Sequence, residues 1–385
     1  MPPQARISNI DLLRGLVMII MALDHTRDFI HAEGFTGDPL NLETTTPLLY
    51  ITRWITHLCA PTFVFLSGTS VYLQSLRKSK HALSIFLFTR GLWLIFVEVA
   101  IITLAITFDI SYSVVVLQVI WAIGISMVIF AALIRLPFFA ILFIGVIVVA
   151  GHNLLDIYEA GKQDFPLWYS FLHRPVFNRD GFVLLYPFLP WTGLMLLGYC
   201  FGRFYLADVM NRHKRSIMLG LSLIAFFIVM RFTDVYGDPI PWSSQKNALF
   251  TVFSFINTQK YPPSLLYLSI TIGISLVILG LAGDTRNSLT KFVEVFGQVP
   301  LFYYILHFYL IHIISAILYL SRGHSFEEGV RGEPGFFARF VKLDEGYSLA
   351  VVYLVWIFVV LVLYPVCRKY ASYKLSHRKW WLSYL

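Results

Sequence analysis

Residues 347–368 read Y-S-L-A-V-V-Y-L-V-W-I-F-V-V-L-V-L-Y-P-V-C-R, with no charged side chain before Arg368. A helix of about 20 apolar residues is long enough to cross the hydrocarbon core of a bilayer. Similar runs recur along the chain and predict an all-α polytopic membrane protein with about ten transmembrane helices. The predicted spans are 10–30, 49–76, 82–108, 111–134, 136–155, 183–205, 216–233, 263–282, 298–320 and 347–368. Pro61 is expected to break the second span, and Pro187 and Pro190 the sixth.

The composition of the 385 residues agrees with this prediction. Hydrophobic residues make up 57% of the chain and charged residues 14%, whereas a soluble protein carries about 25% charged residues. This balance excludes a soluble enzyme, a coiled coil and a disordered chain. The net charge of +8 is spread over short loops, and no nucleic acid is expected as a partner. The three cysteines fall in separate spans and are expected to be buried thiols. We expect one integral membrane domain over residues 1–385.

The charges of the loops predict an orientation, because lysine and arginine concentrate in cytoplasmic loops. With both termini in the cytoplasm, the basic loops near residues 77–80, 212–215 and 286–291 fall on the cytoplasmic side. The long loops at 31–48, 156–182, 234–262 and 321–346 then lie on the opposite side. We expect them to form an acceptor-binding vestibule, and the alternative is a set of solvated connectors. A further short or re-entrant segment around 247–258 is left open.

The first span carries several ionisable residues, which are functional candidates because they are costly inside a membrane. Arg14 and His25 are eleven residues apart, so they share a helix face and lie ~16 Å apart along its axis. Asp28 follows His25 by one turn and is a candidate to orient its imidazole ring. Asp11 precedes Arg14 by one turn and is its candidate ion-pair partner.

Polar residues of the first span and of other spans are predicted near the depth of His25 and suggest one polar chamber. Its candidates are Asp24, His57, Glu98, Gln118, Trp191, Tyr304, His307 and His312. For any single histidine the alternative is an interhelical hydrogen bond, and for Trp191 a structural kink. For Arg53 and Arg90 we favour an interface position or a structural ion pair. No H-x-x-x-H or E-x-x-H spacing is present, so no metal is expected.

Several motifs taken together resemble the catalytic domain of heparan-α-glucosaminide N-acetyltransferases. They are I-D-L-L-R-G, D-H-T-R-D-F and A-P-T-F-V-F-L-S-G-T-S, followed by P-W-T-G-L-M-L-L-G-Y and F-G-Q-V-P-L-F-Y-Y-I-L-H. The last two look like those of bacterial members. The resemblance is strongest over about 5–80, with islands at 185–204 and 294–313. Asp11, Arg14 and His25 also match the spacing in the first helix of the related acyltransferase-3 proteins.

The resemblance implies a membrane-bound acyltransferase that moves an acetyl group from cytosolic acetyl-CoA to an amine or hydroxyl of a sugar or glycan across the membrane. Arg14 is then the candidate for binding the CoA phosphates, and His25 for the general base. The lysosomal relatives have their histidine in the loop beyond the first span, which makes His31 the alternative base. Direct transfer and an acyl-histidine intermediate both stay open.

Two other classes of function fit parts of the pattern. A proton-coupled secondary transporter would use His25, Glu98, His57 and His312 as a relay, although no internal repeat is evident. A non-catalytic membrane scaffold would not need the buried polar residues. The absence of a large amino-terminal luminal domain favours a bacterial plasma membrane as the location, and the oligomeric state is left open.

Overall fold

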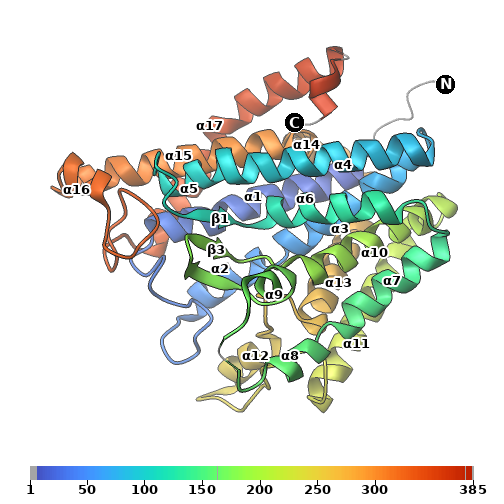
Figure 1. Cartoon of the computed structure of the whole chain (residues 1–385), viewed down its shortest axis with the longest axis horizontal. Helices are drawn as coiled ribbons and strands as arrows, with labels where there is room; N and C mark the ends of the chain where they lie inside the picture. Colours follow the sequence, from blue (N-terminus) through green and yellow to red (C-terminus); the bar gives the residue numbers. More distant parts are fainter. Residues whose placement is uncertain (1–6, 163, 378, 384–385) are drawn as a thin grey trace. The chain divides into compact units, whose positions relative to one another are not determined.

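The computed structural model describes residues 7–162, 164–377 and 379–383 and is mostly helical (Figure 1). Within these described residues, six helical segments are long and apolar enough to cross a membrane. They are Lys80–Thr107 (α4, a π-helical turn and α5), Phe138–Glu159 (α7 with α8), Arg212–Thr233 (α11), Leu265–Ala282 (α13), Pro300–Ser321 (α15) and Leu349–Ser376 (α17). The prediction of a helical membrane protein is confirmed at this level.

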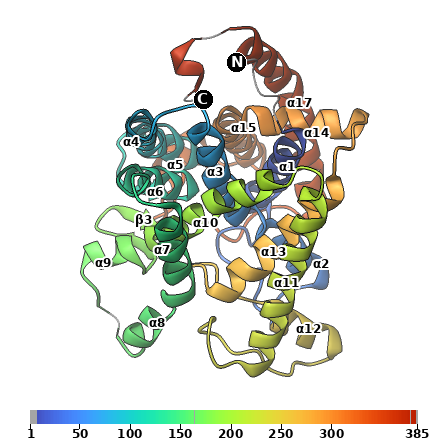
Figure 2. The ribbon, with the colours of Figure 1, turned by 90° about the vertical axis from the view of Figure 1, so that its right-hand side faces the viewer.

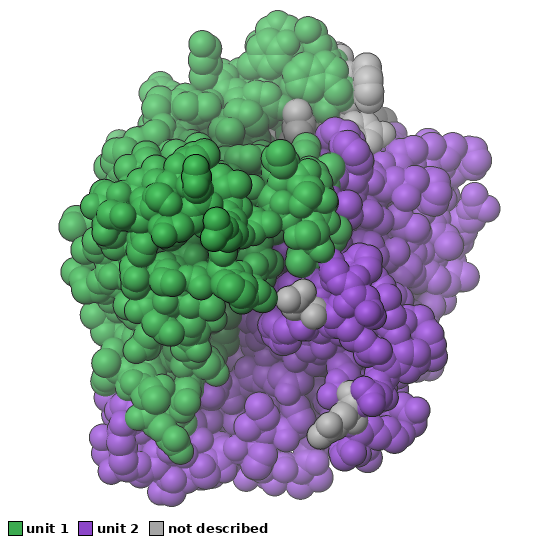
Figure 3. All heavy atoms as spheres, turned by 60° about the vertical axis from the view of Figure 1, so that its left-hand side comes forward, with its two compact units in different colours: residues 1–59, 100–115, 284–385 green, residues 60–99, 116–283 purple. Residues whose placement is uncertain are grey.

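The chain forms two compact units, which Figure 3 shows in different colours. The first unit combines residues 1–59, 100–115 and 284–385, and the second combines residues 60–99 and 116–283. The helical segment Lys80–Thr107 contributes residues to both units. Segments that are far apart in the sequence therefore build each unit.

Helix α1 (Ser8–Ile30) lies at the centre of the first unit and contacts α2 (Pro47–Thr56), α14 (Ser288–Gln298), α15 and α17. It is buried on several sides, and its buried residues include Asp11, Asp24 and Arg27 as well as apolar side chains. Gly15 lets it approach α14 closely, because a Cβ there would lie 2.0 Å from the carbonyl oxygen of Val293. Trp356 of α17 donates from Nε1 to the carbonyl of Ile19 at 2.8 Å. These contacts fix the rotation of α1 and hence the direction of its polar side chains.

The second unit is built from pairs of packed helices, which can be followed in Figure 2. α4 (Lys80–Phe96) packs against α6 (Val119–Leu133), α7 (Phe138–Gly151) against α10 (Phe188–Ala207), and α11 against α13. α3 (Cys59–Ser75) crosses α10 at two glycines. A Cβ at Gly68 would lie 2.0 Å from the carbonyl oxygen of Met195, and small residues permit such close helix contacts in membranes.

Pro61, Pro187 and Pro190 lie at helix starts rather than at breaks. The predicted span 49–76 is two helices, α2 and α3, which are separated beside His57 and not at Pro61. Pro61 occupies the first turn of α3, where its missing N–H group costs no helical hydrogen bond. Pro187 is the N-cap of α10, and Pro190 follows in its first turn, so α10 is continuous. The expected breaks at these three prolines are therefore wrong.

The predicted span 111–134 begins too early, because residues 115–117 form a strand. This strand, β1 (Val115–Leu117), joins β2 (Val176–Arg179) and β3 (Phe182–Leu184) in the order β1-β3-β2. Asp180 and Gly181 connect β2 to β3 with φ angles of 53° and 78°, which an Asp-Gly hairpin turn favours. Helix α6 therefore starts only at Val119 and is shorter than a typical span.

Short helices also lie in the predicted long loops. They are α9 (Leu167–Leu172), α12 (Ala248–Ile256) and α16 (Phe326–Arg331). α12 occupies the region around 247–258 where a further short segment was left open.

Candidate functional site

His25 of α1 faces α15 within the first unit. Its Nδ1 lies 2.7 Å from Nε2 of His307. The ring of Phe308 stacks on the imidazole of His25 with centroids 4.0 Å apart. Tyr304 presents its ring edge-on to the same imidazole at 6.1 Å. Three of the predicted residues, His25, Tyr304 and His307, therefore lie together.

The main chain fixes the direction of the hydrogen bond between the two histidines. Nδ1 of His307 lies 3.0 Å from the carbonyl oxygen of Tyr303. A carbonyl oxygen only accepts, so Nδ1 of His307 carries a proton and its Nε2 carries the lone pair. Nδ1 of His25 is then the donor to His307, and the lone pair of the His25 ring lies on Nε2. His307 is buried and His25 is half-buried.

Arg14 lies where α1 contacts α14. Its Nη1 lies 2.9 Å from Oδ1 of Asp11 and donates to the carbonyl of Gly297 at 3.3 Å. The predicted ion pair between Asp11 and Arg14 is therefore present. Asp11 and Gly297 together orient the guanidinium, while a role of Arg14 in binding phosphate stays a prediction.

Asp24 joins two arginines in a buried ionic network. Its Oδ1 lies 3.2 Å from Nη2 of Arg27, and its Oδ2 is paired with Arg53. Arg27 is only 3% exposed and is also paired with Asp28. Arg53 thus forms the structural ion pair that we favoured for it. The structure gives Asp28 a contact with Arg27, so its role in orienting His25 stays a prediction.

His31 is the first residue after α1. Its Nδ1 accepts a hydrogen bond from the main-chain N–H of Glu33 at 3.2 Å. The neighbouring main chain is bound to Tyr347, whose N–H donates to the carbonyl of Ile30 at 2.8 Å. Burial and the charge of Arg27 lower the pKa of His31, although Glu33 acts in the opposite sense. The net lowering favours the neutral imidazole, which is the form that a general base needs.

His312 lies on α15 and has a structural environment. Its Nδ1 lies 2.8 Å from the carbonyl oxygen of Ala105, and its Nε2 lies 2.8 Å from that of Arg339. Phe108 stacks on the ring with centroids 3.7 Å apart. His312 thus joins α15 to the end of α5 (Thr103–Thr107), which is the hydrogen-bonding role expected of a lone histidine. His57, also predicted for the chamber, is buried just after α2.

Glu98, Gln118 and Trp191 belong to the second unit. Glu98 is fully buried in the π-helical turn Val97–Ile102, a type of turn that is frequent at functional sites. Its carboxylate accepts a hydrogen bond from the main-chain N–H of Gln118. Trp191 is fully buried in the first turn of α10 and contacts Tyr186 with ring centroids 5.0 Å apart.

A polar cluster at 152–173 is absent from the sequence-based prediction. His173 lies between two partners, with Nδ1 2.7 Å from Oε1 of Glu159 and Nε2 3.1 Å from Nδ1 of His152. The ligand atoms of Asp156, Glu159 and His173 lie within 4.8 Å of one another, so these residues could hold a metal ion. The signal in the sequence was H-x-x-x-D-x-x-E at 152–159, a spacing that places side chains on one helix face.

One family model matches residues 6–231, more than half of the chain, and is described as heparan-α-glucosaminide N-acetyltransferase, catalytic. The match includes Arg14, His25 and His31, whereas His307 and the motif at 294–313 lie beyond its end. A comparison with curated proteins found no match.

Proposed function

Because the chain belongs to the family of heparan-α-glucosaminide N-acetyltransferase catalytic domains and is a membrane acetyltransferase, we propose that it uses cytosolic acetyl-CoA to acetylate a sugar or glycan across the membrane. The observation that carries this proposal is the contact between His25 and His307. We further propose one integral membrane domain over residues 1–385, with ten spans and both termini in the cytoplasm of a bacterial cell.

His25 is the proposed general base. Its Nε2 takes the proton from the amine or hydroxyl of the acceptor as that group attacks the thioester carbonyl. The tetrahedral intermediate then expels the CoA thiolate, and His25 transfers to it the proton that came from the acceptor. While His25 is protonated, its Nδ1–H remains bonded to His307, so the charged ring keeps its orientation. Asp28 remains the candidate for orienting the ring of His25, and Tyr304 and Gln118 remain candidates for donating to the developing oxyanion. Asp24, His57, Glu98, Trp191 and His312 keep their place as candidates from the sequence-based prediction alone.

Arg14 and Asp11 form the proposed cofactor end of the site. A guanidinium binds phosphate with two parallel hydrogen bonds, and Asp11 limits the orientations that Arg14 adopts. Arg14 is separated from His25 by ~16 Å along α1, a distance of the order that the pantetheine arm of CoA must bridge. Acetyl-CoA supplies the acetyl group at the His25 end.

The assignment of the base is tested by removing each histidine near the end of α1. His25→Ala should reduce acetyl transfer by about 10²–10⁴-fold, the usual value of general-base catalysis. CoA binding, measured by calorimetry, should persist because the imidazole acts on the acceptor. His31→Ala is the matched control and should keep its activity. An inactive His31→Ala with an active His25→Ala would make His31 the base, and two active variants would refute histidine catalysis in this segment.

A further inference from the structure

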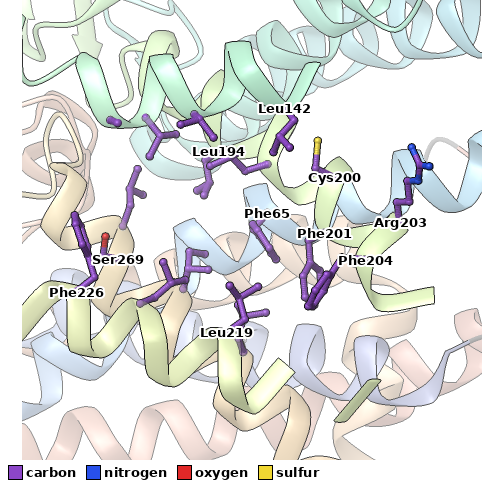
Figure 4. A pocket seen from close by; sticks show the side chains of 18 of the residues that line it. Phe65, Leu142, Leu194, Cys200, Phe201, Arg203, Phe204, Leu219, Phe226 and Ser269 are labelled. Carbon is purple, nitrogen blue, oxygen red and sulfur yellow. The ribbon is translucent and has the colours of Figure 1, made fainter. Parts of the chain in front are cut away.

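An apolar cavity of about 760 Å³ lies in the second unit, lined by residues of α3, α7, α10, α11 and α13 (Figure 4). Figure 4 shows Leu142 of α7 on one side of the cavity and Leu219 of α11 on the opposite side. The lining of α7 extends from Phe138 to Ala150. Twelve helical steps correspond to ~18 Å, so the cavity follows more than half the thickness of a bilayer core.

The walls of this cavity offer almost no hydrogen bonds. Aromatic and aliphatic side chains form most of the lining, and Phe65, Phe201 and Leu194 lie around its centre (Figure 4). The hydroxyl of Ser269 is already used, because it donates to the carbonyl of Leu265 at 2.7 Å. The cavity is open on one side, because its lining residues Phe139 and Phe226 are exposed, and water in it would find few polar partners. An apolar ligand therefore suits this cavity.

Positive charge gathers at one end of the cavity. The guanidinium of Arg203, itself a lining residue, lies 4.3 Å from the ring centroid of Phe138. That of Arg215 lies 4.0 Å from the ring centroid of Phe204, which is also a lining residue. The segment 203–215 that contains these two arginines also carries Arg212 and Lys214. Asp208 is the one carboxylate of this segment, and it accepts hydrogen bonds from Asn211. The net charge at this end is therefore positive.

We propose that this cavity binds one acyl chain of an anionic phospholipid, with the lipid phosphate bound by Arg203 and Arg215. An acyl chain matches an elongated apolar cavity between membrane helices, and a phosphate diester matches two guanidinium groups. The pantetheine arm of CoA fits less well, because its two amides would lose their hydrogen bonds to water without finding partners. This lipid site depends only on the membrane location of α7 and α11 and is independent of the acetylation chemistry.

The test uses the purified full-length chain, delipidated in detergent and titrated with phosphatidylglycerol or with phosphatidylcholine of identical acyl chains. Native mass spectrometry counts the lipids retained. The wild type should retain one phosphatidylglycerol in preference to phosphatidylcholine. The double variant Arg203→Ala/Arg215→Ala should weaken this binding at least tenfold, since charge-assisted contacts are lost. Arg286→Ala, an exposed arginine before α14, is the matched control and should bind as the wild type does.

The cavity itself is tested by filling it. Leu142→Trp should reduce retention of phosphatidylglycerol, whereas Phe143→Trp, on the exposed face of the same helix, should not. Thermal melting verifies that each variant is folded, and Arg203→Lys/Arg215→Lys, which keeps the charge, should restore part of the binding. Equal retention of the two lipids, or unchanged binding by the double alanine variant, would overturn the proposal. Displacement of the lipid by CoA, together with loss of CoA binding in Leu142→Trp, would assign the cavity to CoA instead.

Discussion

At the scale of single residues, the contact between His25 and His307 depends on how two helices are rotated. The sequence placed both histidines in one polar chamber, because depth follows from counting residues along a helix. Their direct hydrogen bond requires the rotation of α1 and α15, which Gly15 and Trp356 help to set through contacts distant in sequence. The ion pair of Asp11 with Arg14 was predictable because one helical turn separates the two residues.

His307 is expected to position the base rather than to take part in the reaction. His307→Ala should lower kcat by about 10- to 100-fold, within the range of losses caused by misplaced catalytic groups. The KM for acetyl-CoA should stay unchanged. His307→Gln should recover part of the loss, since its amide oxygen can accept from Nδ1–H of His25. Steady-state kinetics of the two variants give this comparison, and a rise in KM without a fall in kcat would contradict a positioning role.

Arg14 is expected to contribute to cofactor binding. Arg14→Ala should raise the KM for acetyl-CoA and weaken CoA binding, because a phosphate contact is made in the ground state and the transition state alike. Arg14→Lys should recover only part of the affinity, since an ammonium group cannot make the forked contact. Calorimetry with CoA measures both effects. Unchanged affinity in a folded Arg14→Ala protein would make the pair of Arg14 with Asp11 purely structural.

At the scale of elements, long apolar helices were predictable and their interruptions were not. Strand β1 has three residues, too few for an alternating pattern to stand out from the apolar run that follows. Pro61, Pro187 and Pro190 were expected to break helices because a proline ring blocks the interior of a helix, but they lie at an N-cap or in a first turn, where the ring is tolerated. The separation of α2 from α3 beside His57 could not be predicted, because neither Gly nor Pro stands at that position.

The turn after α5 should be sensitive to acid. Burial alone would raise the pKa of Asp109, but hydrogen bonds from Ser111 and Ser113 outweigh it and hold the pKa well below its ordinary value. The carboxylate also lies 3.6 Å from Nη2 of Arg339. Asp109→Asn should therefore cost about 1–3 kcal/mol of stability at pH 7.

The pH dependence of this cost follows from the sign of the shift. A carboxylate with a lowered native pKa stabilises the fold above its unfolded pKa of about 3.9, and this stability is lost as the pH falls toward the native value. The melting temperatures of the wild type and of Asp109→Asn should converge as the pH drops below about 4. A difference that stays constant between pH 7 and pH 3 would show that the Asp109 carboxylate does not contribute in this way.

At the scale of the whole molecule, composition was sufficient to predict a membrane protein. Six helical segments of the described residues meet the length and hydropathy of a span. Four of the ten predicted spans, 10–30, 49–76, 111–134 and 183–205, depart from this pattern, and α6 in the third of them is too short. α1 carries too many charged residues, and α2 and α3 divide one apolar run between two helices. The mean hydropathy of a sequence segment does not show how the charges of α1 are accommodated or where α2 ends and α3 begins.

The proposed orientation is tested with reporter fusions. Fusions after residue 80 and at the carboxyl terminus should report a cytoplasmic location, and a fusion within 160–180 should report the opposite side. The reason is that the short basic loops all fall on one side in the ten-span arrangement. A cytoplasmic signal from 160–180 would refute that arrangement.

The hydrogen bond from His307 to the carbonyl of Tyr303 also bears on energy coupling. A peptide carbonyl has no proton to pass on. A proton taken up at Nε2 of His25 therefore cannot continue through His307 along a chain of hydrogen bonds. Such a pair can take a proton from the acceptor and pass it to the leaving thiolate in each turnover, but it offers no path for a proton to flow down an electrochemical gradient. Proteoliposomes containing the chain but given no acetyl-CoA should therefore hold an imposed pH difference as long as empty ones.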